Sequence, residues 1–177
     1  MPVVHDFESI KKQYLELHSK AIQNNKEAMH FDVEDWRNTL SDIQLKVYKD
    51  IKSVGTYLYP LYPIGDYFID FGNPFKKVGI EILYKERERE ERMACIQYFE
   101  KLGWTVYTLE SKYVENSAEE LFSKQMNRPG QNFYSDDNMF EFVEQNKDKS
   151  SECLIYYIKQ KYITPTFQED VEEEEED

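Results

Sequence analysis

The spacing of the apolar residues changes in the middle of the chain, and this change constrains the fold more than any other feature. Three short segments have the clustering or alternation typical of β-strands: residues 57–62, 67–71 and 78–83. Helical spacing marks the segments around them: residues 6–22, a segment that begins at Ser41, and residues 85–102. A fourth strand is predicted at 104–109, directly after Gly103. This order predicts a mixed α/β sheet flanked by helices.

Local signals place several ends and edges of these elements. Ser41 and Gln44 have the spacing of a capping box, which predicts a helix start. Pro60 lies within the first strand and restricts it to an edge of the sheet or to a bulge, because proline cannot donate a ladder hydrogen bond. Three more helices are expected after the fourth strand, within 117–126, 136–146 and 151–162.

The charge of the chain is concentrated at its C-terminal end. The formal net charge is −13, and eight acids fall within residues 169–177, which leaves −5 for the rest. Such a run repels itself, so residues 166–177 are predicted to be a disordered tail. Two roles are considered for this tail: it improves solubility, or it competes with nucleic acid for a basic cleft. The remaining organisation is predicted as an N-terminal helical extension (1–40), a core (41–110) and C-terminal helices packed on it (111–165).

Composition also bears on location. No stretch approaches the roughly 18–20 apolar residues of a membrane helix, so no membrane partner is expected. Two cysteines are too few for a disulfide scaffold, which favours a reducing, intracellular and cytoplasmic location.

The second and third strands carry the residues of greatest chemical interest. A hairpin symmetric about its turn places Asp70 directly opposite Glu81. Two facing carboxylates repel each other, so their negative charges must be screened by solvent or balanced by a positive charge. The open alternatives are solvent on an exposed sheet face, a basic neighbour such as Lys77 or Lys85, and a divalent cation held by the two acids.

Three motifs in this region resemble those of a known nuclease family: Tyr62–Phe71 (YPIGDYFIDF), Val78–Ile82 (VGIEI) and Gly103–Val106 (GWTV). Their order and spacing are similar to the core of the very-short-patch-repair-like endonucleases and their bacterial relatives within the PD-(D/E)XK superfamily. The resemblance covers roughly residues 41–110. It implies a restriction-endonuclease-like αβββαβ core, to which this chain adds N-terminal and C-terminal helices.

The resemblance also implies a metal-dependent site for phosphodiester hydrolysis. Asp70 and Glu81 correspond to the metal-binding and catalytic acids, and the ion is Mg²⁺ or Mn²⁺. Gln44 stands where the relatives have a glutamate and is a candidate ligand through its carbonyl oxygen. Leu83 stands where they have an acid or a lysine. Lys85 is a candidate catalytic replacement, because alternate strand residues share a face, or it begins a solvated helix.

Further residues are candidates for contacts with nucleic acid, DNA in the first place. Arg87, Arg89 and Arg92 either contact backbone phosphates or pair with neighbouring glutamates on an exposed helix. Tyr62 either stacks on a base or packs within the edge strand. A homodimer is considered because cutting both strands commonly needs two sites.

Two functions are therefore compared. The first is a divalent-metal-dependent DNA endonuclease with a rearranged site. The alternative is a catalytically degenerate nuclease-fold module that binds nucleic acid or a protein partner, which Leu83 and Gln44 favour.

Overall fold

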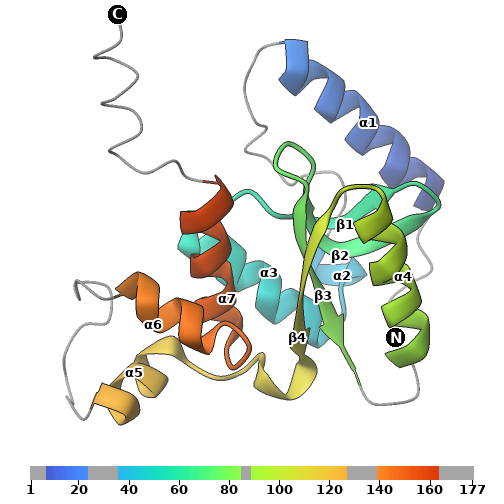
Figure 1. Cartoon of the computed structure of the whole chain (residues 1–177). Helices are drawn as coiled ribbons and strands as arrows, with labels where there is room; N and C mark the ends of the chain where they lie inside the picture. The colour runs from blue at the N-terminus through green and yellow to red at the C-terminus, as the bar shows by residue number, and fades with distance from the viewer. Residues whose placement is uncertain (1–6, 24–35, 85–88, 127–138, 164–177) are drawn as a thin grey trace, which may run out of the picture.

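A four-stranded mixed sheet forms the centre of the computed structural model, which describes residues 7–23, 36–84, 89–126 and 139–163 (Figure 1). The strands are adjacent in chain order: β1 (Tyr59–Ile64), β2 (Tyr67–Asn73), β3 (Val78–Leu83) and β4 (Thr105–Glu110). Strand β2 is antiparallel to both β1 and β3, and β4 runs parallel to β3. The predicted mixed α/β sheet is confirmed, and β1, which contains Pro60, is an edge strand as expected.

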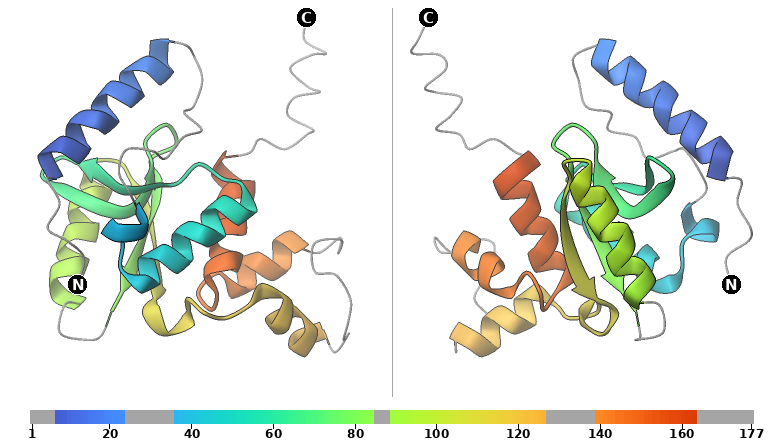
Figure 2. Two further views of the ribbon diagram at one scale, coloured as in Figure 1. Left: turned by 180° about the vertical axis from the view of Figure 1, so that it is seen from behind. Right: turned by 45° about the vertical axis from the view of Figure 1, so that its right-hand side comes forward.

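Helices cover both faces of this sheet. The described part of the chain holds seven α-helices: α1 (Phe7–Gln23), α2 (Trp36–Thr39), α3 (Asp42–Val54), α4 (Arg89–Lys101), α5 (Ala118–Met126), α6 (Met139–Asn146) and α7 (Ser151–Ile158). The crossover helix α4 lies on one face, and α3 and α7 lie on the other (Figures 1 and 2). Within the described residues, no helix combines the length and the apolar character needed to cross a membrane.

Two helix ends form as the sequence predicts. The Ser41 hydroxyl accepts a hydrogen bond from the Gln44 amide nitrogen at 3.2 Å, and Gln44 Oε1 accepts one from the Ser41 amide at 3.0 Å. This capping box fixes the first turn of α3. At the end of α4, Gly103 has φ +91°, a conformation that favours glycine, and the chain turns there into β4.

Other boundaries differ from the predictions. The helix expected over 85–102 is described only from Arg89 to Lys101, and residues 85–88 lie outside the described part. The last helix is α-helical only to Ile158 and continues as a π-helical turn over Lys159–Ile163. The predicted acidic tail, 166–177, lies outside the described residues.

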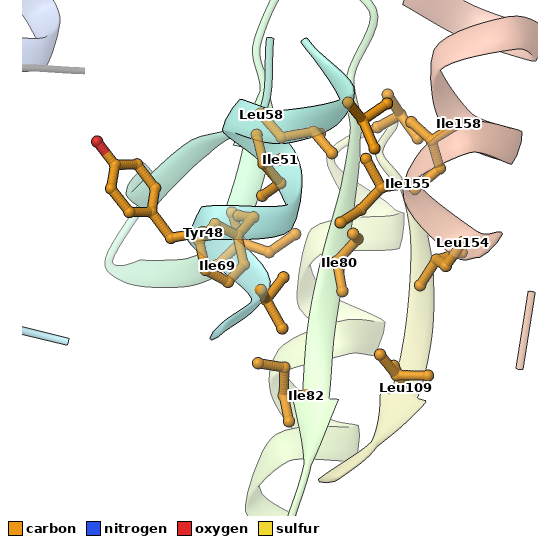
Figure 3. Close-up of a cluster of buried hydrophobic side chains, with 14 of the residues drawn as sticks. Tyr48, Ile51, Leu58, Ile69, Ile80, Ile82, Leu109, Leu154, Ile155 and Ile158 are labelled. Atoms are coloured by element: carbon orange, nitrogen blue, oxygen red, sulfur yellow. The ribbon is translucent and has the colours of Figure 1, made fainter. Parts of the chain in front are cut away.

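The largest part of the core lies between the sheet and the α3–α7 layer. Ile69, Ile80 and Ile82 come from the strands and are fully buried (Figure 3). Helix α3 adds Ile51 and α7 adds Ile155, both also fully buried. Strands that are covered on both faces lose water from all of their side chains, and every residue of β3 is buried. Any polar side chain on β3 therefore needs a partner inside the protein.

Polar contacts tie α7 to α3 next to this core. The Ser151 hydroxyl donates to the buried carboxylate of Asp50, and Lys46 donates to both oxygens of the same carboxylate at 2.7 Å. Lys159 Nζ donates to the Val54 carbonyl at 2.9 Å, near the end of α3. These contacts satisfy a buried charge and join α7, with the turn that follows it, to α3.

The hairpin of β2 and β3 requires close backbone approach at Gly79, which leads to a first prediction. A Cβ at this position would lie 2.5 Å from the Phe71 carbonyl oxygen and 2.5 Å from Ile69 Cδ1. We expect Gly79→Ala to lower the free energy of unfolding by about 1–3 kcal/mol, as overpacking does. Urea denaturation measures the change.

The control is Thr108→Ala at an exposed position of β4, which should change the free energy of unfolding by only about 0.5 kcal/mol. Equal stability of Gly79→Ala and the unmodified protein would contradict the close approach of the two strands.

Candidate active site at the split of the sheet

Strands β2 and β3 separate at Asp70 and Glu81. Their pairing runs from Asn73 opposite Val78 to Phe71 opposite Ile80. Beyond that point β2 stays with β1, where Ile69 lies opposite Tyr62, and β3 stays with β4, where Glu81 lies opposite Thr108. The register is the one predicted, so Asp70 and Glu81 are the first pair of residues at the split.

The two carboxylates replace the backbone bonds that the split removes. The amide of Asp70 donates to Glu81 Oε1 at 2.7 Å, and the amide of Ile82 donates to Asp70 Oδ2 at 2.8 Å. Each acid thus accepts from the backbone of the opposite strand. These two bonds satisfy buried amide groups and hold both carboxylates in defined positions.

Arg92 of α4 forms ion pairs with both acids and balances their charge. Its Nη1 atom donates to Asp70 Oδ2 at 2.9 Å and to Glu81 Oε2 at 3.0 Å. Asp70 and Glu81 are only 4% and 2% exposed, so the alternative of a solvated sheet face is wrong for this pair. Their described basic partner is an arginine, whereas Lys77 lies near Gly103 at the other end of the hairpin.

Tyr84 and Ser41 complete one side of the site. The guanidinium of Arg92 lies 4.8 Å from the centre of the Tyr84 ring, a cation–π contact. The Tyr84 hydroxyl lies 3.5 Å from the Ser41 hydroxyl, at the start of α3. The site therefore lies where the start of α3, the end of β3 and the first turn of α4 meet.

Gln44 reaches the site, but as a donor. Its Nε2 atom donates to Asp70 Oδ1 at 2.9 Å, and its Oε1 atom accepts from the Ser41 amide in the capping box. The prediction that Gln44 is a metal ligand through its carbonyl oxygen does not match this arrangement, because that oxygen is engaged in the helix cap. In this arrangement Gln44 orients Asp70.

Burial and the neighbouring negative charge change the protonation of Glu81. Burial, and then the negative charge of Asp70, raise the pKa of Glu81 from 4.5 to about 8, against the lowering effect of the Asp70 amide and Arg92. Burial opposes the charge of Arg92, but the carboxylates of Asp70 and Glu81 outweigh it and raise the pKa of the guanidinium. The arginine therefore stays charged as the counterion of the pair.

Of the other predicted site residues, the structure describes Arg89 and Tyr62, and it places both of them away from this cluster. Lys85 and Arg87 lie outside the described residues. Arg89 forms an ion pair with Glu110 at 2.9 Å, at the end of β4. Tyr62 is buried and packs against Trp104, with 6.1 Å between ring centres, so the prediction that it stacks on a base does not fit its place in the core.

Leu83, at the position where the resembling family has an acid or a lysine, is buried at 5% exposure. Sequence reasoning did not identify Arg92 as the shared partner of Asp70 and Glu81. One signal for it exists: two acids that face each other on neighbouring strands of a covered sheet need a cation, and the crossover helix that follows the second strand packs back over the sheet.

Asp70 and Glu81 offer oxygen ligands of the kind that a divalent ion prefers. Asp70 Oδ2 and Glu81 Oε2 converge on a single cationic nitrogen, which stands in for a shared ion. Carboxylate oxygens suit Mg²⁺, which one or two carboxylates hold together with water and phosphate oxygens. No group of three or more His, Cys, Asp or Glu side chains around a common point occurs within the described ranges. Arg92 Nη1 lies 2.9 and 3.0 Å from these two oxygens, so a Mg²⁺ ion at its usual distance of about 2.1 Å would lie closer to both of them than the nitrogen does, and the two acids would supply two of its ligands.

Comparison of the chain with family models, with curated proteins and with solved structures found no match in any of the three. The geometry of the site and the motifs of the sequence are therefore the features from which a function is inferred.

The raised pKa of Glu81 leads to a second prediction. Between pH 4.5 and about 8 the folded protein retains a proton that the unfolded chain has released, so the free energy of unfolding falls as pH rises through this range. Glu81→Gln removes this titration. We expect the melting temperature of the unmodified protein to fall relative to that of Glu81→Gln between pH 5 and pH 8.5, as measured by circular dichroism.

Glu110→Gln provides the comparison, because Glu110 is a more exposed acid whose hydrogen bond from Arg89 lowers its pKa. Its melting curve should not reproduce the pH dependence of Glu81→Gln. Parallel pH profiles for Glu81→Gln and the unmodified protein would show that Glu81 does not titrate in this range.

Proposed function

We propose that this chain is a divalent-metal-dependent endonuclease that hydrolyses phosphodiester bonds of DNA. One observation carries the proposal: Asp70 Oδ2 and Glu81 Oε2, from neighbouring strands at the split of the sheet, converge on one cation. The element order α3, β1, β2, β3, α4, β4 also supports it, because it is the αβββαβ order that the sequence motifs imply.

The chain supplies a prearranged pair of ligands. The amides of Ile82 and Asp70 fix one oxygen of each carboxylate, and Gln44 Nε2 fixes the second oxygen of Asp70. A bound Mg²⁺ or Mn²⁺ would lower the pKa of a water molecule and stabilise negative charge on the phosphate. Asp70 and Glu81 would hold the ion and provide no nucleophile. Because the strands position both acids, little reorganisation is needed for them to act together.

A second candidate is a catalytically degenerate module with the same architecture, which binds nucleic acid or a protein partner. The observation that favours it is the Arg92 guanidinium between the two acids, where it already balances their charge. Leu83 is apolar and buried, and the Gln44 carbonyl oxygen is engaged in the helix cap. In this candidate the cluster only stabilises the fold.

Plasmid nicking in Mg²⁺ or Mn²⁺ tests the nuclease. We expect the unmodified protein to nick supercoiled DNA, EDTA to abolish the activity, and Asp70→Asn to reduce the rate by about 100-fold or more through loss of a metal ligand. Glu81→Ala should have a similar effect.

Asp66→Asn is the matched control, since Asp66 is an exposed acid in the β1–β2 turn, and it should retain the full rate. Equal nicking by Asp70→Asn and the unmodified protein would remove Asp70 from the active site. Absence of nicking by the unmodified protein, together with measurable DNA binding, would favour the degenerate module.

A further inference from the structure

We propose that Arg92 is the resident cation of this site and that a divalent ion binds Asp70 and Glu81 only by displacing its guanidinium group. Arg92 would thereby act as a built-in competitor that limits metal occupancy. The inference rests on the proposed function, because it concerns the same two ligands.

The first argument is that both cations need the same oxygens. Arg92 Nη1 contacts Asp70 Oδ2 and Glu81 Oε2, the two oxygens that converge. A Mg²⁺ ion bound to both at the usual distance of about 2.1 Å would fall within the space of the guanidinium nitrogen. Two cations cannot occupy this point together, so binding of one excludes the other.

The second argument is that the acids cannot turn to form a separate site. Glu81 Oε1 is held by the Asp70 amide, and Asp70 Oδ1 is held by Gln44. Gln44 is itself fixed by the capping box of α3. Rotation of either carboxylate would leave a buried donor without its acceptor, which is unfavourable. The exchange of cations must therefore occur at the oxygens that Arg92 contacts.

The third argument is that Arg92 is the most readily displaced partner. Its side chain is 25% exposed, against 5% for Asp70 and 3% for Glu81. Both ion pairs use the single atom Nη1, so Arg92 does not hold either acid with the two-nitrogen fork that makes arginine–carboxylate pairs strong. A long side chain with a partly exposed head can move out while the backbone of α4 stays in place.

Calorimetric titration of the full chain with Mn²⁺ at pH 8 tests the inference. Arg92→Gln removes the competing charge, and we expect it to lower the Mn²⁺ dissociation constant by about tenfold or more relative to the unmodified protein. Arg89→Gln is the matched control on the same helix, since its partner is Glu110, and it should leave the constant unchanged. Arg92→Lys keeps a positive charge but loses the guanidinium group that contacts both acids and the Tyr84 ring, so it should bind Mn²⁺ more tightly than the unmodified protein and less tightly than Arg92→Gln. It serves as the test if Arg92→Gln does not fold.

The outcomes separate this inference from the proposed function. Asp70→Asn, made in both the unmodified and the Arg92→Gln proteins, reports whether Mn²⁺ binds at this site at all. Loss of binding in Asp70→Asn with no gain in Arg92→Gln or Arg92→Lys would overturn the role of Arg92 and leave the metal site standing. Mn²⁺ binding that ignores Asp70, or no binding in any protein, would overturn both.

Discussion

The reciprocal hydrogen bonds between Asp70 and Glu81 are the interaction on which the centre of this protein depends. Each carboxylate accepts from the backbone at the opposite strand, where the ladder between β2 and β3 ends. The split would otherwise expose amide groups to a buried environment, which is costly. The two acids accept the hydrogen bonds of the backbone amides at the split, and in doing so they bring two acidic groups together in the interior.

This buried pair of acids is contacted from both layers of helices. Helix α4 supplies Arg92 from one side, and α3 supplies Gln44 from the other, so the split connects the two layers of helices. The capping box at Ser41 both starts α3 and fixes the orientation of Gln44. A cation is required at this point whatever the function, because removing the partner of a buried charge is strongly destabilising. In our proposals, that requirement is met by Arg92 at rest and by a metal ion in the active state.

Much of this arrangement could be predicted from local patterns. The register of the β2–β3 hairpin follows from the position of its turn, and so the pairing of Asp70 with Glu81 was accessible from the sequence. The edge position of Pro60 and the cap at Ser41 were accessible for the same reason, since both depend on neighbouring residues. The burial of Tyr62 could not be predicted in this way, because the side chains that pack against it, Tyr14 and Trp104, are distant in the chain.

The sequence by itself determined the order of the elements and the strand register, because spacing and turn residues act over a few positions. Only the tertiary structure decided which cation compensates the two acids. Arg92 lies on a helix with alternating charges, and no local pattern distinguishes it from the other arginines near it. Its role arises when the crossover between β3 and β4 packs α4 back against the sheet, so that one of several charged side chains meets the split.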